Sequence, residues 1–177
     1  MNRKVILYIA MSLDGYIARS DGDISFLSVV EKQGEDYGYS DFIESVDTVI
    51  LGRKTFDKVL SMGIDDPYGN RHIYVLTHIA RLATDQVTFY SESLPDLIYK
   101  LKEQTGKHIY CDGGAETVHE FLKYDLFDEL IISILPVMLG DGICLFGQSF
   151  SEQKLRLVKS TSFEKGLVQL HYIRVRN

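Results

Sequence analysis

Runs of consecutive apolar residues recur along the chain, and segments with a helical spacing of apolar positions separate them. The continuous runs are typical of strands buried on both faces of a parallel sheet, and they cover residues 4–10, 46–52, 72–77, 107–111 and 129–135. Segments with apolar residues on one helical face begin near residues 40, 53, 93 and 115. This alternation predicts an α/β fold, with a mostly parallel central sheet flanked by helices.

Local signals indicate where several of these elements begin and end. Ser93 is a suitable N-cap for an amphipathic helix that ends before Gly106. Ser40 is expected to cap a short helix whose apolar face extends to Val46. Residues 155–175 read as two alternating strands joined by a Lys-Gly turn. The parallel sheet is therefore expected to carry an antiparallel C-terminal hairpin at its edge.

Composition limits the class of protein. The chain has 177 residues, 45% of them hydrophobic, and shows no repeat or linker, so a single domain over residues 1–177 is expected. A net charge of −6 makes nucleic acid and anionic membranes poor partners, and no apolar stretch approaches the roughly 18 residues that span a bilayer. No cleavage site follows the first apolar run, which favours a cytoplasmic location. Cys111 and Cys144 are expected to be free and mostly buried, without a metal role.

The first chemical signal is a cationic turn after the run at residues 46–51. Gly52 is expected to let the chain turn, and Arg53, Lys54 and Thr55 follow where a helix begins. A helix N-terminus already carries partial positive charge, so basic residues there favour a bound anion, with phosphate as the natural candidate. Two solvated cations on a surface turn are the alternative interpretation.

A second turn, Asp112–Glu116, follows another strand and contains Gly113 and Gly114. Two adjacent glycines let backbone N–H groups approach a pyrophosphate closely, although a tight turn without a ligand would use them as well. A glycine-rich turn and a cationic turn on one sheet favour a dinucleotide that carries an extra phosphate, NADP rather than NAD. Neither the GxGxxG nor the GxxxxGK[ST] pattern is present, which argues against a Rossmann domain and a P-loop.

The motifs resemble those of the dihydrofolate-reductase-like superfamily, and most closely its riboflavin-biosynthesis reductase domain in a stand-alone form. The resemblance covers nearly the whole chain and is carried by SLDGYIA at residues 12–18, LGRKTF at 51–56, YVLT at 74–77, DGGA at 112–115, DEL at 128–130 and PVMLGDG at 136–142. It implies a three-layer αβα domain with a central sheet of about eight strands. It also implies a homodimer.

The resemblance assigns roles by position. It implies that NADPH contacts Ala10, Asp14, Gly15, Ile17, Gly52, Arg53, Lys54, Thr55, Leu76, Thr77, Asp112, Gly113, Gly114, Ala115 and Glu116. It places Leu139, Gly140 and Asp141 in a loop that closes the substrate end. Arg71 enters a strand beside that region, where it either holds a phosphate or carboxylate or is an ordinary surface arginine.

The implied reaction is hydride transfer from NADPH to a heterocycle resembling a ribitylamino-pyrimidine or a pterin, as in 5-amino-6-(5-phosphoribosylamino)uracil reductases. Asp36 and Asp14 are the candidate catalytic acids, because a proton has to reach the neighbouring heteroatom from an acid or from water. Solvated carboxylates, or an ordinary Asp-Gly turn at Asp14, are the alternatives. The chain has no tryptophan, which argues against dihydrofolate as the substrate. A catalytically silent NADP-binding module with a sensing or scaffolding role is the second hypothesis.

Overall fold

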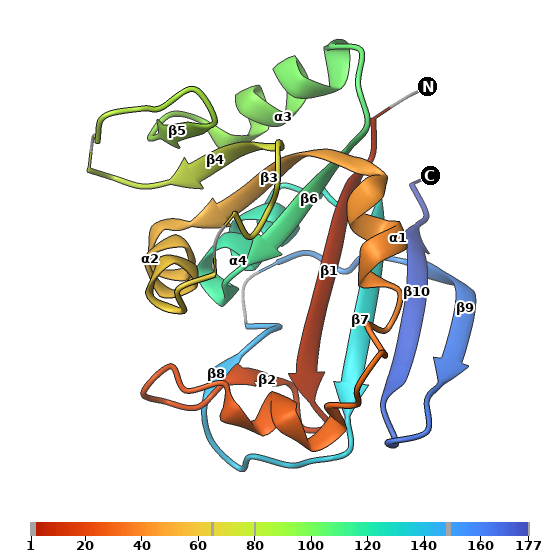
Figure 1. Ribbon diagram of the computed structural model, residues 1–177. Coiled ribbons are helices and arrows are strands. Elements are labelled where there is room, and N and C mark those ends of the chain that lie inside the picture. Colours follow the sequence, from red (N-terminus) through yellow and green to blue (C-terminus); the bar gives the residue numbers. More distant parts are fainter. Residues whose placement is uncertain (1–2, 65, 80, 148–149, 177) are drawn as a thin grey trace.

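An eight-stranded sheet forms the centre of the computed structural model, which describes residues 3–64, 66–79, 81–147 and 150–176 (Figure 1). Its strand order is β5-β4-β3-β6-β1-β7-β10-β9. The strands are β1 (Val5–Ser12), β3 (Val46–Gly52), β4 (His72–Leu76), β5 (Val87–Tyr90), β6 (His108–Gly113), β7 (Glu129–Leu135), β9 (Leu155–Ser162) and β10 (Val168–Arg174). All neighbours from β5 to β7 pair in parallel, and β10 and β9 are antiparallel, as the sequence predicts.

Helices cover both faces of the sheet and produce the predicted three-layer α/β arrangement. They are α1 (Tyr39–Glu44), α2 (Arg53–Ser61), α3 (Leu94–Glu103) and α4 (Ala115–Lys123). Phe42 of α1 and Phe56 of α2 join one apolar core, and α3 and α4 join the other. Successive strand residues point to opposite faces, so Val5 and Leu7 of β1 enter the second core while Ile6 enters the first. Burial on both faces explains why these strands read as continuous apolar runs.

Two smaller elements lie beyond the carboxyl end of β1. The short 3-10 helix η1 (Ser25–Val30) packs against β7, and β2 (Tyr16–Ala18) pairs with β8 (Ile143–Cys144) in a separate ribbon (Figure 1). The sequence patterns did not predict η1, β2, β5 or β8, because each is too short to show a clear period. Pairing with other strands defines β2, β5 and β8, and η1 packs against β7.

Of the two helix caps predicted from the sequence, one is confirmed and one is wrong. The Ser93 cap of α3 is confirmed, because the Asp96 N–H donates to the Ser93 hydroxyl. The Ser40 cap is wrong: Gly38, which is in the left-handed region at φ 83°, is the N-cap of α1, and Ser40 lies within the helix. Val46 begins β3 instead of extending the helix. Of the two free cysteines, Cys111 is buried as expected, but Cys144 is exposed in β8.

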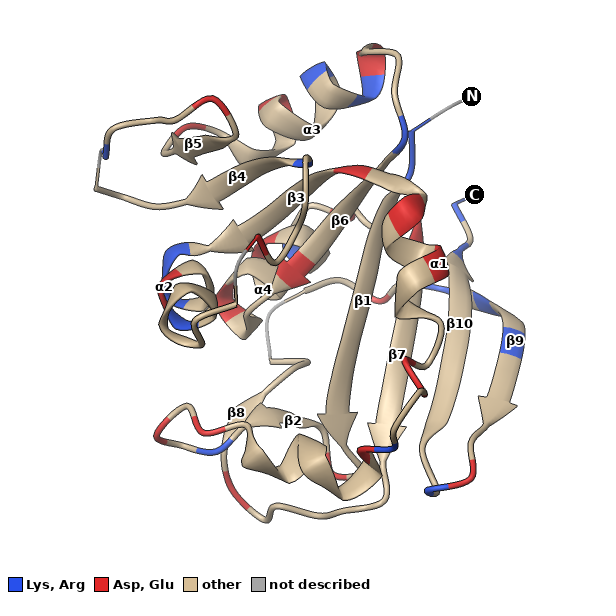
Figure 2. Cartoon of the chain, viewed as in Figure 1, with Lys and Arg blue, Asp and Glu red and all other residues tan. Residues whose placement is uncertain are grey.

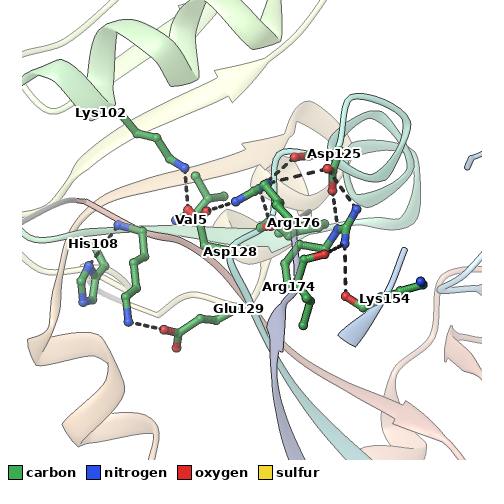
Figure 3. Close-up of polar contacts among 12 residues, drawn as sticks. Val5, Lys102, His108, Asp125, Asp128, Glu129, Lys154, Arg174 and Arg176 are labelled. Carbon is green, nitrogen blue, oxygen red and sulfur yellow. Dashed lines mark hydrogen bonds and ion pairs between the residues drawn. The ribbon is translucent and has the colours of Figure 1, made fainter. Parts of the chain in front are cut away.

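Charged side chains join the two chain termini at the amino ends of the strands (Figure 3). The Asp128 carboxylate accepts the Lys102 ammonium at 2.6 Å, the Arg176 guanidinium at 2.6 Å and the Val5 N–H at 2.8 Å. Arg174 pairs with Asp125 at 2.7 Å. This network fastens β10 and the C-terminal segment to β1 and α3, at the end of the sheet opposite the turns described below. Among the described residues, no helix is long and apolar enough to cross a membrane.

Candidate functional site

The two turns singled out in the sequence lie next to each other. Strands β3 and β6 are parallel neighbours, so α2 and α4 begin side by side at the carboxyl end of the sheet (Figure 1). The Gly114 N–H donates to the Thr55 hydroxyl at 2.7 Å, and the Lys54 ammonium pairs with Glu116 at 2.8 Å. Two helix N-termini therefore face one short stretch of surface, where both can attract an anion.

Glycine serves a different purpose in each turn. The chain turns from β3 into α2 at Gly52 as expected, but with extended backbone at φ −76° that any residue can adopt. A Cβ at Gly52 would lie 2.8 Å from the Thr117 hydroxyl oxygen, so the residue is small because α4 approaches it closely. Gly113 has φ +101°, which disfavours any residue with a side chain. Its peptide bond to Gly114 is cis.

The two cations of the first turn have carboxylate partners. Arg53 pairs with Asp57 one helical turn further along α2, at 2.7 Å, and is 34% exposed. Lys54 is 74% exposed, and its hydrogen bond to Glu116 lowers the pKa of that carboxyl group. Exposed ion pairs contribute little free energy. A phosphate that arrives at this turn can therefore displace both carboxylates at small cost.

Leu76 and Thr77 lie at the carboxyl end of β4, the next strand beside β3. Leu76 is paired with Gly52 across β4 and β3. Thr77 is buried, its N–H donates to the Tyr90 carbonyl at 3.0 Å, and its hydroxyl accepts the Ile79 N–H at 3.0 Å. The structure thus brings Leu76 and Thr77 to the edge of the cationic turn, with the Thr77 hydroxyl engaged in its own loop.

Asp14 joins the Asp-Gly turn to the loop predicted to close the substrate end. Its carboxylate accepts the Ser12 hydroxyl at 2.5 Å and the N–H groups of Leu139 and Gly140 at 3.1 and 2.7 Å. The Ser12 hydrogen bond, aided by that of Gly140, lowers the pKa of Asp14 to about 2. Asp141 continues the connection, because it accepts the Ser20 hydroxyl at 2.9 Å.

Replacing Asp14 with alanine is expected to separate this turn from the loop. The N–H groups of Leu139 and Gly140 would lose their acceptor, so amide hydrogen exchange should rise in residues 12–18 and 137–142. Mass spectrometry of exchanged peptides measures this. Asp21→Ala is the matched control, because Asp21 accepts only within its own turn. Unchanged exchange in residues 137–142 would contradict the proposed connection.

Ile17 and Ala10 extend the site from the turns toward an open cavity. The Ile17 side chain reaches within 3.9 Å of where a Gly114 Cβ would lie, so β2 runs across the second turn. Ala10 pairs with Ser133 across β1 and β7, and both line a cavity of about 590 Å³ beside η1. This volume falls within the range of small-molecule sites. Gly15, at φ +90°, turns the chain between Ala10 and Ile17.

A polar network that the sequence did not reveal forms the floor of this cavity. The Gln169 amide nitrogen lies 3.1 Å from the Tyr8 hydroxyl, 3.1 Å from the Tyr37 carbonyl and 3.2 Å from the Ser133 hydroxyl. Tyr8 also donates to the Tyr37 carbonyl at 2.8 Å. One signal was available: Ser133 is a hydroxyl residue in the otherwise apolar run from Leu130 to Leu135.

Asp36 lines the same cavity, but it precedes α1 instead of lying on it. Its carboxylate accepts the N–H groups of Ser40 and Gly38, each at 2.9 Å, and these bonds together with the Ser40 hydroxyl lower the pKa of Asp36. Asp36 therefore provides an acceptor for a first-turn N–H of α1 from a position two residues before the N-cap, Gly38. Its ionised carboxylate is poorly suited to donate a proton at neutral pH.

Arg71 does not line the cavity. Its guanidinium donates to the Ile43 carbonyl at 2.6 and 3.0 Å and to the Tyr68 carbonyl at 2.7 Å. The Ile43 contact ties the loop before β4 to the end of α1, and the Tyr68 contact lies within that loop. The interpretation of Arg71 as a phosphate-binding residue thus finds no support in this arrangement, and a bracing role fits its contacts.

Asp112 contrasts with Asp14 and Asp36. Burial raises the pKa of the Asp112 carboxyl group, although the hydroxyls of Tyr110 and Tyr68 donate to it. It lies directly before Gly113 at the end of β6, and so adjoins the second turn. Ala115 and Glu116 follow as the first residues of α4. In the described part of the chain, no group of three or more His, Cys, Asp or Glu residues is placed to hold a metal ion.

Comparison with known proteins agrees with this arrangement. The uncharacterized protein YwjB of Bacillus subtilis is 46% identical over 175 residues, which cover 98% of this chain and 99% of YwjB. A Shewanella sp. PV-4 crystal structure, provisionally assigned to riboflavin biosynthesis, is 36% identical, with a TM-score of 0.90 over 98% of this chain and 99% of that one. Dihydrofolate reductase from Enterococcus faecalis, complexed with NADP(H), shares the fold at a TM-score of 0.69 and 18% identity, over 98% of each chain.

The family comparison covers both turns, the Asp14 connection and most of the cavity lining. Residues 3–169 match the model of the RibD C-terminal domain. The dihydrofolate-reductase-like fold and the predicted resemblance are confirmed, and the chain belongs to the RibD C-terminal domain family.

Proposed function

We propose that this protein is an NADPH-dependent reductase of a heterocyclic substrate, either pyrimidine-like or pterin-like. One observation carries the proposal: the two adjacent helix N-termini continue, through Ile17 and Ala10, to a cavity large enough for such a ring. A dinucleotide along the strand ends would place one end at Arg53 and the other at Ala10. Membership of a family of reductase domains supports this interpretation.

Residues of this chain would bind and orient the cofactor. The uncapped first-turn N–H groups of α2 and α4 suit phosphate oxygens, and Arg53 and Lys54 suit the additional 2′-phosphate of NADPH. When bound, NADPH supplies a hydride that adds to the carbon of a polarised C=N or C=O bond, while the π electron pair moves to the heteroatom, which takes up a proton. Ala10 and Ile17 would lie beside the reacting ring.

A reductase needs a source for that proton, whereas an NADP-binding module without catalysis does not. Asp14 and Asp36 both have lowered pKa values, so neither carries a proton at neutral pH. If the protein is a reductase, water that enters the cavity would therefore donate the proton. The same observation favours a second candidate, an NADP-binding module without catalysis, because the phosphate turns do not depend on a proton donor.

Cofactor titration tests the proposal. The protein is expected to bind NADPH at micromolar concentrations and NADH at least about tenfold more weakly, because NADH offers no charge to Arg53 and Lys54. Isothermal titration calorimetry measures both affinities, and loss of absorbance at 340 nm follows turnover with a panel of oxidised pterins and pyrimidinones. If neither nucleotide binds below millimolar concentration, the cofactor site is wrong. If NADPH binds without any turnover, the silent module is favoured.

The oligomeric state and the cellular location of the protein stay predictions. A homodimer is proposed through the C-terminal hairpin, where β9 is an edge strand with exposed Leu155, Leu157 and Val158. An uncovered apolar edge of this kind is often an interaction surface. A cytoplasmic location is proposed from the sequence alone.

A further inference from the structure

Acidic side chains dominate the rim of the cavity. Glu31, Glu35 and Asp36 line it, together with one basic residue, Lys32. Figure 2 shows acidic positions in red and basic positions in blue along the segment between η1 and α1. The hydrogen bonds already described keep Asp36 ionised at neutral pH. The entrance is therefore negatively charged, which is unusual for a site that has to accept an anion.

Lys32 already has a carboxylate partner, so the pair as a whole adds no net charge to the rim. Its ammonium group is hydrogen-bonded to the Glu164 carboxylate, and this bond raises the pKa of Lys32 and lowers the pKa of Glu164. Each member of the pair thus favours the charged state of the other. The pair also brings a further carboxylate, from the β9–β10 turn, to the neighbourhood of the rim.

The floor of the cavity offers uncharged partners only. Leu27, Val30, Leu135 and Leu167 supply apolar surface, and the Ser133 hydroxyl, with the Gln169 network behind it, supplies hydrogen bonding. A flat ring with a few polar edge atoms suits this lining. A phosphate dianion does not, because this floor would remove its hydration and offer no positive group, and three rim carboxylates outnumber the one rim ammonium, that of Lys32.

We propose that the cavity takes a nitrogen heterocycle that carries no phosphate and is neutral or cationic. The proposal rests on the reductase function above and specifies its substrate class. It departs from the expectation of a phosphoribosyl substrate such as 5-amino-6-(5-phosphoribosylamino)uracil. The guanidinium of Arg71, already engaged with two backbone carbonyls, provides no alternative phosphate contact.

A pair of ligands that differ only by the phosphate tests this substrate class. The probes are 5-amino-6-(5-phosphoribosylamino)uracil and its dephosphorylated ribosyl counterpart, each titrated by calorimetry into the protein saturated with NADP⁺. The unphosphorylated compound is expected to bind at least about tenfold more tightly, a difference of about 1.4 kcal/mol. Equal affinity, tighter binding of the phosphorylated compound, or binding of neither compound would each overturn the proposal.

Reversing one charge at the rim provides a second test of the same substrate class. Glu31→Lys is expected to tighten binding of the phosphorylated probe by at least about threefold and to leave the other probe within about twofold, since Glu31 is exposed and its change acts through charge. Glu103→Lys, on exposed α3 away from the cavity, is the matched control and should change neither affinity. Identical effects of the two variants would show that the rim charge does not select the ligand.

The experiment separates failure of this inference from failure of the reductase proposal. NADPH affinity is measured independently of the two probes and depends on the turns at Arg53 and Gly113. Tight NADPH binding combined with a preference for the phosphorylated probe would leave the reductase standing and overturn the substrate class. Loss of NADPH binding would overturn the reductase itself, whatever the probes do.

Discussion

Replacing Arg53 with alanine is expected to raise the Kd for NADPH by roughly 10- to 150-fold while the Kd for NADH changes by less than about twofold. A charge-assisted contact to phosphate contributes about 1.5–3 kcal/mol, and each 1.4 kcal/mol is about tenfold in affinity. The native partner of Arg53 is a half-exposed carboxylate, Asp57, so the free protein loses little when the side chain is removed. Calorimetric titration of both nucleotides measures the two constants.

Lys58→Ala is the matched control for this change. Lys58 lies on the same helix and carries the same charge, but it belongs to the last turn of α2, away from the strand ends. Removing the Lys58 side chain should alter the NADPH affinity by less than about twofold, because salt screens its charge over the distance to the turn. An equal loss of NADPH and NADH affinity in the Arg53 variant would place that residue away from the 2′-phosphate.

Replacing Asp128 with alanine is expected to lower the free energy of unfolding by about 1–3 kcal/mol, the usual cost of leaving partly buried donors without their acceptor. Burial raises the pKa of Asp128, but hydrogen bonds from Lys102, the Val5 N–H and Arg176 outweigh it and lower the pKa overall. The alanine variant would leave these donors without their acceptor (Figure 3). Urea denaturation followed by circular dichroism measures the change.

Two comparison variants sharpen that measurement. Glu103→Ala removes an exposed carboxylate from α3 and should change the unfolding free energy by less than about 0.5 kcal/mol. Asp128→Asn keeps an acceptor oxygen and should cost less than Asp128→Ala. A loss below about 1 kcal/mol in the alanine variant would mean that the network is held by its other members, Asp125 and Arg174.

Much of the fold was predictable because its signals are local. Strands buried on both faces leave continuous apolar runs, and β1, β3 and β7 lie close to where those runs predicted them. The hydroxyl of Ser93 lies beside the N–H that it caps, so this cap was predictable as well. By contrast, the four residues of β5 gave no periodic signal, and their pairing with β4 defines the strand.

The candidate site likewise has a part that was predictable from the sequence and a part that was not. Both turns proposed to bind phosphate are contiguous segments, so each was visible in the sequence as a glycine or cationic turn after a strand. Tyr8, Tyr37 and Ser133 line the cavity and are joined by Gln169 behind them; the four residues are distant in sequence and individually unremarkable. Asp36 was a candidate acid in the sequence, and the structure adds that its carboxylate accepts the Gly38 and Ser40 N–H groups, which lowers its pKa.

The sequence by itself determined the α/β class, the order of the longer strands and helices, and two glycine-containing strand-to-helix turns, because these properties depend on neighbours along the chain. Only the tertiary structure decided that the Gly114 N–H would reach Thr55, that Asp14 would join two loops, and that an acidic rim would surround an uncharged floor. These features arise from contacts between segments far apart in sequence. The parallel register of β3 and β6 and the pairing of β1 with β7 bring those segments together.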